Sequence, residues 1–154
     1  MKFNLNGRDG MVREDVQTIR DSIDAILVNI DNSLSGYNRK SLVSKFNDGD
    51  QIRPDSLFLD IYARSYEIYD ATSGAVDVAA APLFDIWGFG FKSGNMPDDE
   101  MVRSVRSSCG MGRMVRDMSA AIGTDGVLSP DEMLVLRGEV LPSLNYNAVA
   151  QGYS

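Results

Sequence analysis

Few of the side chains that usually carry catalysis are present, and this narrows the chemistry. The chain contains no His, which excludes Ser-His-Asp and Cys-His catalysis and the zinc sites that need imidazole. Cys109 is its one cysteine, so it can form neither an internal disulfide nor a Cys-x-x-Cys site. We expect Cys109 to be a small buried or half-buried side chain. The composition does not exclude a phosphate ligand, because a few cations, backbone N–H groups or a divalent metal could hold one.

Two segments resemble known ligand loops but lack essential parts. The segment 46–50, with Asn47, Asp48 and Asp50, has the composition of a calcium loop, but the further oxygen ligands and closing Glu of an EF-hand are missing, so we interpret it as a solvated turn. Gly88 and Gly90 form a G-x-G, yet Gly94 comes one position too late for G-x-G-x-x-G. No P-loop pattern occurs either, so the chain lacks both of these common nucleotide-binding motifs.

What remains is an ordered set of short motifs. In chain order they are L-S-G-Y-N at 34–38 followed by Ser41, F-N at 46–47, T-S-G-A-V-D-V at 72–78, P-L-F-D-I-W-G-F-G at 82–90, and L-N-Y-N-A-V-A-Q-G-Y at 144–153. Each is weak by itself. Tyr37 could be an ordinary half-buried tyrosine, Trp87 a core residue, and Asp77 a cap or a surface carboxylate.

Taken in order, the motifs resemble those of the FAD:protein FMN transferases, the ApbE-type family long called thiamine-biosynthesis lipoproteins. Family members show L-S-x-Y-x-x-x-S, T-x-G-A-F-D-V-T, P-L-x-x-x-W-G-F-G and L-D-L-G-G-I-A-K-G-Y-A segments, whose order and spacing match this chain from about residue 31 to 153. The chain departs from these patterns with Val76 for Phe, Asn145 for Asp, Asn147 and Ala148 for Gly-Gly, and Gln151 for Lys. The stretch 110–142 is longer than usual, and the family's opening strand with its M-G-T motif is missing or cut to residues 2–5. The chain thus resembles the N-terminal part of such a protein.

The resemblance implies an activity and its cofactors. Family members transfer the FMN half of FAD to a Thr or Ser hydroxyl of an acceptor protein and release AMP, and magnesium is required. Some hydrolyse FAD to FMN and AMP instead. A fragment of a transferase, an FAD-binding or FAD-hydrolysing relative, and a non-catalytic structural domain therefore stay open as alternatives. The resemblance also suggests export and a periplasmic or cell-envelope lipoprotein in the intact protein, although no lipobox Cys is present here.

By the same resemblance, specific residues acquire expected roles. Tyr37 should contact the flavin nucleotide, with stacking as one geometry open to its ring, and Ala75, Val76 and Asp77 should line the adenosine side. Asn145 and Gln151 should lie near the nucleotide, and the backbone carbonyl of Ala148 should bind the metal. The family's other metal ligands, an Asp and a Thr or Ser, belong to a later segment that this chain does not contain. No catalytic residue can be named, and we expect the isolated 154-residue chain to be inactive.

The elements that must position these residues can be predicted from periodicity and caps. Apolar residues spaced 3, 4, 3 and 4 apart predict an amphipathic helix over 16–30. A second helix should begin after the segment 54–56 and stop at 72–74, and a third should begin at 97–100. The segments 114–122 and 133–140 are plausible strands around a turn at 124–126.

Together these elements predict an α+β class with an ApbE-like, T-fold-like domain, in which helices pack on a mostly antiparallel sheet. Residues 1–154 should form one partial domain that exposes an apolar face or an open sheet edge. The Val-x-Val of 76–78 permits a short strand. Trp87 should be largely buried, packed with Leu83 and Phe89.

Composition sets the remaining bounds. With 154 residues, 44% hydrophobic, the chain suits one globular domain. Its formal net charge of -7 makes nucleic acid and anionic membrane unfavourable partners. No run is apolar enough to span a bilayer. The polar residues after Met1 argue against a signal peptide, so we expect the chain as it stands to be soluble, with no targeting segment.

Overall fold

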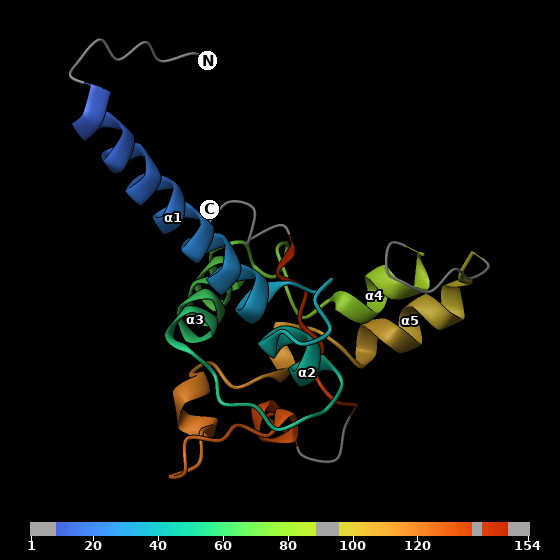
Figure 1. Ribbon diagram of the computed structural model, residues 1–154. Coiled ribbons are helices and arrows are strands. Elements are labelled where there is room, and N and C mark those ends of the chain that lie inside the picture. Colours follow the sequence, from blue (N-terminus) through green and yellow to red (C-terminus); the bar gives the residue numbers. More distant parts are fainter. Residues whose placement is uncertain (1–8, 89–95, 137–139, 148–154) are drawn as a thin grey trace.

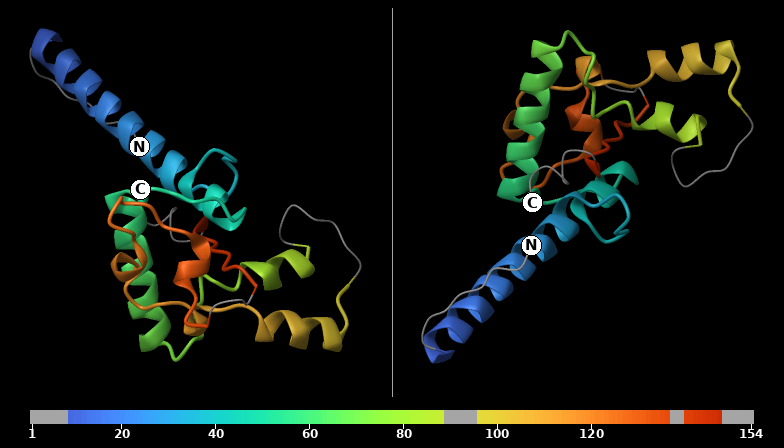
Figure 2. Two further views of the ribbon diagram at one scale, coloured as in Figure 1. Left: turned by 90° about the horizontal axis from the view of Figure 1, so that it is seen from below. Right: turned by 90° about the horizontal axis from the view of Figure 1, so that it is seen from above.

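A computed structural model describes residues 9–88, 96–136 and 140–147 (Figure 1). Over these ranges the chain is mostly helical. Its elements are α1 (Asp9–Leu34), α2 (Leu42–Asn47), α3 (Ser56–Ala71), α4 (Ala81–Ile86), α5 (Asp99–Ser107) and the 3-10 helices η1 (Met111–Arg113), η2 (Met118–Ala121) and η3 (Pro130–Met133). Figure 2 shows α1 projecting away from the body, whereas α4 and α5 lie side by side on another edge. Of the remaining elements, η2 packs against α3.

Side-chain caps define where α3 and α5 begin. Asp55 caps α3, because its side chain accepts a hydrogen bond from the backbone N–H of Phe58 at 2.7 Å. The hydroxyl of Ser33 donates to the same carboxylate at 3.0 Å, which ties the end of α1 to the start of α3. Asp98 caps α5 in the same way. The predicted helices at α1, α3 and α5 are confirmed, and the capping residues of α3 and α5 explain where these two begin.

One hydrophobic core lies around α3. This helix buries Phe58, Ile61 and Tyr62, and α2 contributes Phe46. The rings of Phe46 and Tyr146 flank Phe58, with ring centroids 6.0 and 5.9 Å away. The other buried residues come from the end of α1, from α2, from the 3-10 helices and from the segments between elements, namely Leu34, Val43, Ile52, Val78, Ala79, Met111, Met114, Met118, Leu128, Met133 and Leu144. Segments far apart in the sequence thus share one packed interior.

The predicted strands at 114–122 and 133–140 are wrong for the part of the chain that the structure describes. Of the two isolated antiparallel bridges, Ile52–Leu128 and Met114–Leu134, the second joins the two predicted segments. The helix η2 lies inside the first segment, and η3 ends at Met133, where the second segment begins. Each short helix begins where a residue favours a turn, Asp117 before η2 and Pro130 within η3. The turn at 124–126 is confirmed, since Gly126 donates to the carbonyl of Gly123 at 2.9 Å. The expected sheet is therefore not found among the described residues.

The apolar stripe of α1 lies largely in solvent. Ile19, Ile23 and Ile26 are exposed along this stripe, and Leu27 beside them is exposed as well. Only the last turn of the helix reaches the core, through Leu34. The expectation of an exposed apolar face is thus confirmed at α1. Among the described residues, no helix combines the length and apolarity needed to cross a membrane.

Trp87 contradicts the expectation of a buried indole. It is 45% exposed and occupies the C-cap of α4, whose single buried residue is Ala81. A six-residue helix at the edge of the body offers too little surface to enclose an indole. Phe89, the partner that the sequence suggested, lies outside the described residues.

Candidate nucleotide cleft

Three segments form a cleft of about 940 Å³. The first runs from Tyr69 at the end of α3 to Phe84 in α4, the second from Arg106 in α5 to Arg113 in η1, and the third contributes Asn145 and Asn147. A volume of this size is at the upper end of those that hold small-molecule ligands. The cleft therefore has room for a large ligand such as a nucleotide.

The structure brings four of the sequence-predicted residues together here. Ala75, Val76, Asp77 and Asn145 all line the cleft, although Asn145 is far from the others in sequence. The remaining predictions differ in outcome. Ala148 and Gln151 lie outside the described residues.

Tyr37 is not part of the cleft lining and is 73% exposed. Its neighbour Gly36 nevertheless borders the third segment, because a Cβ at Gly36 would lie 3.3 Å from the side-chain oxygen of Asn147. The loop that carries Tyr37 is therefore adjacent to the cleft, while the ring itself points largely into solvent. A stacking role for Tyr37 stays a prediction.

The end of α3 shapes the first wall. The backbone N–H of Gly74 donates to the carbonyl of Tyr69 at 2.8 Å, and Ser73 and Gly74 both take positive φ values of 52° and 82°. This closes the helix as glycine-containing C-terminal motifs do. The hydroxyl of Thr72 then accepts a hydrogen bond from the N–H of Val76 at 3.1 Å. The chain is thus turned sharply so that residues 75–77 face the cleft.

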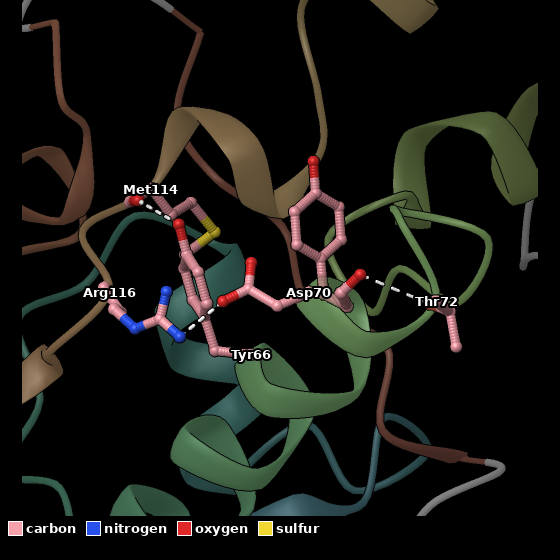
Figure 3. Close-up of polar contacts among 6 residues, drawn as sticks. Tyr66, Asp70, Thr72, Met114 and Arg116 are labelled. Atoms are coloured by element: carbon pink, nitrogen blue, oxygen red, sulfur yellow. Dashed lines mark hydrogen bonds and ion pairs between the residues drawn. The ribbon is translucent and has the colours of Figure 1, made fainter.

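A polar and aromatic cluster ties α3 to residues 114–116, which directly follow the second wall (Figure 3). Arg116 forms an ion pair with Asp70, and its guanidinium carbon lies 5.2 Å from the ring centroid of Tyr66. The Tyr66 hydroxyl donates to the carbonyl of Met114 at 3.4 Å. Tyr66 in turn packs edge-on against Tyr69, with centroids 5.8 Å apart. Because Tyr69 lines the cleft, this cluster holds one side of the cleft in place.

Asp77 links the first two walls through its carboxylate. Its Oδ1 accepts a hydrogen bond from the N–H of Ala79 at 2.9 Å, and both oxygens lie within reach of the N–H of Met111, at 3.1 and 3.2 Å. Gly110 has a φ of 110°, and a Cβ there would lie 3.0 Å from Asp77 Oδ2. Asp77 is thus a structural cap that also borders the cleft, one of the readings that the sequence left open.

Asn145 is held in the third wall by backbone contacts. Its N–H donates to the carbonyl of Val78 at 2.7 Å, which joins this segment to the first wall. Its side-chain oxygen accepts a hydrogen bond from the N–H of Asn147 at 3.1 Å. The side-chain carbonyl is therefore used within the loop.

Sequence reasoning missed two cations and placed one thiol correctly. Arg106 and Arg113 line the cleft, but no motif singled them out, since isolated arginines in a helix and a short turn carry no pattern. Cys109 is half-buried, as expected. Burial raises the pKa of its thiol, the nearby Asp77 carboxylate raises this pKa further, and Arg113 lowers it. The thiol thus remains protonated near neutral pH and is a poor nucleophile.

Within the described ranges, no group of three or more Cys, Asp or Glu side chains could hold a metal ion. The expected metal contact, the carbonyl of Ala148, lies beyond them.

The sequence of the chain is similar to those of known proteins. The ApbE family model matches residues 3–154. FAD:protein FMN transferases are among the curated relatives: that of Escherichia coli K12 is 28% identical over 109 residues, or 68% of this chain and 29% of the relative. That of Buchnera aphidicola is 34% identical over 83 residues, covering 51% and 24%.

Solved structures show the same fold. The flavinyl transferase ApbE of Pseudomonas stutzeri, in its apo form, matches with a TM-score of 0.68 and 23% identity over 89% of this chain and 40% of that one. The flavin transferase ApbE of Vibrio cholerae matches with a TM-score of 0.67 and 20% identity, over 98% and 44%. The chain thus spans less than a third of these curated relatives and less than half of these solved structures. Since the family model covers nearly every residue, the chain belongs to the ApbE family.

Proposed function

We propose that the protein containing this chain is an FAD:protein FMN transferase, which moves the FMN half of FAD to a Thr or Ser hydroxyl of an acceptor protein and releases AMP. Residues 1–154 supply one part of the family domain and one part of the nucleotide site. Membership of the family supports this proposal, as do the curated relatives that carry this name.

The observation that carries the proposal is the convergence in one cleft of residues from two distant family motifs. Ala75, Val76 and Asp77 come from the first motif and Asn145 from the second, and all four line a cavity large enough for a nucleotide. Ala75 has a small side chain, so a ligand can approach the backbone closely there. We assign the adenosine side of FAD to this wall.

The described residues would bind and orient FAD rather than act on it chemically. Phosphoryl transfer depends mainly on positioning and on charge stabilisation. Asp77 is engaged by two backbone N–H groups, so it shapes the site and does not act as a free base. Tyr37 would contact the flavin nucleotide from the adjacent loop, and Gln151 would lie near the nucleotide with Asn145.

Magnesium belongs to the proposal through the family resemblance, with the carbonyl of Ala148 as one ligand and the others outside this chain. When bound, magnesium would neutralise charge on the pyrophosphate. Export and a lipid anchor in the intact protein are proposed on the same resemblance, and cell fractionation of a tagged full-length protein tests them.

One experiment separates the alternatives. The full-length protein is incubated with FAD, magnesium and a Thr-bearing acceptor peptide, and the products are resolved by mass spectrometry. Flavinylated peptide together with AMP supports the transferase. Free FMN and AMP without modified peptide would identify an FAD hydrolase, and no turnover at all would indicate a non-catalytic relative.

A further inference from the structure

Arg106 and Arg113 lie on one wall of the cleft, and no motif of the family assigned them a role. We propose that these two guanidinium groups form an anion subsite that binds the phosphates of the nucleotide. This inference rests on the proposed function only in that it takes the ligand to be a nucleotide. It adds a phosphate-binding role for side chains of this chain.

The charge of the cleft supports an anionic ligand. The whole chain carries a formal net charge of -7, yet the charged side chains among the residues that line the cleft are Arg106, Arg113 and Asp77. Two guanidinium groups against one carboxylate leave this lining net positive on an acidic protein. A local positive field of this kind attracts and orients anions.

The one carboxylate in the lining is already engaged. The oxygens of Asp77 accept hydrogen bonds from the backbone N–H groups of Ala79 and Met111. These bonds stabilise the negative charge locally and leave it less able to repel a phosphate. The arginines therefore dominate the electrostatics that an incoming ligand meets.

The wall between the two arginines is packed closely and depends on glycine. Arg106 lies in the last turn of α5, and Arg113 ends η1. Gly110 and Gly112 lie between them and line the cleft. A Cβ at Gly112 would come within 2.7 Å of the Tyr69 hydroxyl, and one at Gly110 within 3.0 Å of Asp77. Side chains at these two positions would crowd Tyr69 and Asp77, so the glycines let both lining residues pack against the wall that carries the cations.

Guanidinium groups suit the phosphates of a nucleotide better than other cations do. Their planar forks donate paired hydrogen bonds to phosphate oxygens, and they stay charged at every physiological pH. Arg113 is half-buried and Arg106 is exposed, so Arg113 can act inside the cleft and Arg106 at its rim. We expect the larger share of phosphate affinity from Arg113.

The test compares ligands with and without phosphate in the full-length protein. Binding of ADP, FAD, adenosine and riboflavin is measured by isothermal titration calorimetry for the wild type and for Arg106→Gln, Arg113→Gln and Arg113→Lys. Arg103→Gln is the matched control, because Arg103 lies on the same helix α5 but does not line the cleft. Thermal melting of each ligand-free variant shows whether it is folded.

We expect Arg113→Gln to weaken ADP and FAD binding by about ten-fold or more, and Arg106→Gln by less, as loss of charge-assisted hydrogen bonds implies. Adenosine and riboflavin should bind unchanged, and Arg113→Lys should keep part of the affinity. The Arg103 control should behave as the wild type. If Arg113→Gln fails to fold, Arg106→Gln and Arg113→Lys carry the test.

Equal losses for adenosine and ADP, or an unchanged ADP affinity in the folded variants, would overturn the subsite. The proposed function fails separately. Arginine-dependent ADP binding without any transfer of FMN would leave the subsite standing and refute the transferase. Transfer of FMN with ADP binding that does not depend on the arginines would support the transferase and refute the subsite.

Discussion

The side-chain amide of Asn47 forms two hydrogen bonds with the backbone of Leu144, a residue near the other end of the chain. Its Nδ2 donates to the carbonyl of Leu144 at 2.8 Å, and the N–H of Leu144 donates to its Oδ1 at 2.7 Å. The amide thus pairs with the peptide as a neighbouring strand would. Because Asn145 follows directly and contacts Val78, this clamp positions the third wall of the cleft.

Asn47→Ala should therefore destabilise the protein. It removes both bonds and leaves the polar groups of Leu144, itself buried, without these partners, which costs about 1–3 kcal/mol. The measurement is urea unfolding followed by circular dichroism. Asn32→Ala is the matched control, because Asn32 is exposed on α1, and its unfolding midpoint should hardly change. An Asn47 variant as stable as this control would refute the clamp.

Asp77 should contribute to stability whether or not it contacts a ligand. Asp77→Ala removes the acceptor for the N–H groups of Ala79 and Met111. A hydrogen bond to a charged group contributes about 1.5–3 kcal/mol, so the free energy of unfolding should fall. Asp77→Asn keeps one side-chain oxygen as an acceptor, so it should lose less. Melting temperature and FAD affinity are measured on both variants. Unchanged stability in Asp77→Ala would contradict the capping role, and a loss of affinity in a stable Asp77→Asn would show a ligand contact.

Tyr37 should matter for ligand binding and little for folding. Because its side chain is mostly exposed, Tyr37→Ala should leave the melting temperature of the ligand-free protein nearly unchanged. Stacking of an aromatic ring on a base contributes roughly 1–3 kcal/mol in nucleic-acid sites, so FAD affinity should fall about ten-fold or more on that scale. Fluorescence titration measures this, and an unchanged dissociation constant would remove Tyr37 from the site. Tyr37→Phe, which keeps the ring, should bind nearly as the wild type does.

The long helices could be predicted because their signals are local. Periodic apolar residues along α1 and the capping carboxylates Asp55 and Asp98 act within a few residues of the helices they start. The expected strands failed for the opposite reason. Mixed segments such as 114–122 are compatible with an extended chain, but a strand also needs a partner, and Met114 and Leu134 form one isolated bridge. The prediction that Trp87 is buried was wrong for a similar reason, since burial depends on the surrounding fold.

In the candidate site too, residues that belong to a motif could be predicted, and residues placed only by the fold could not. The order of the motifs alone predicted that Ala75, Val76, Asp77 and Asn145 share a nucleotide site. The structure places all four in one cleft. Arg106 and Arg113 could not be found in this way. They reach the cleft because α5 and η1 pack beside it, and nothing in their own sequence neighbourhood signals that position.

The exposed stripe of α1 leads to a prediction about the isolated chain. Ile19, Ile23 and Ile26 lie on one side of a helix that projects from the body (Figure 2). An apolar stripe in water favours association, and its spacing of 3 and 4 residues is that of helices that pair. We therefore expect the 154-residue chain to self-associate as its concentration rises. Sedimentation velocity over a range of concentrations measures this.

Replacing two residues of the stripe should reverse the association. The double variant Ile23→Glu with Ile26→Glu puts charges on the face that would be buried between copies, so it should sediment as a monomer at concentrations where the wild type does not. Val28→Glu is the matched control, because Val28 is also an exposed apolar residue of α1 but lies on the opposite side of the helix, as the 100° turn per residue requires. The control should associate as the wild type does. Since both sites are exposed, neither change should alter the unfolding of the core around α3. Equal association of the double variant and the wild type would show that another surface holds the copies together, and a monomeric wild type at every concentration would show that the stripe is too weak to pair.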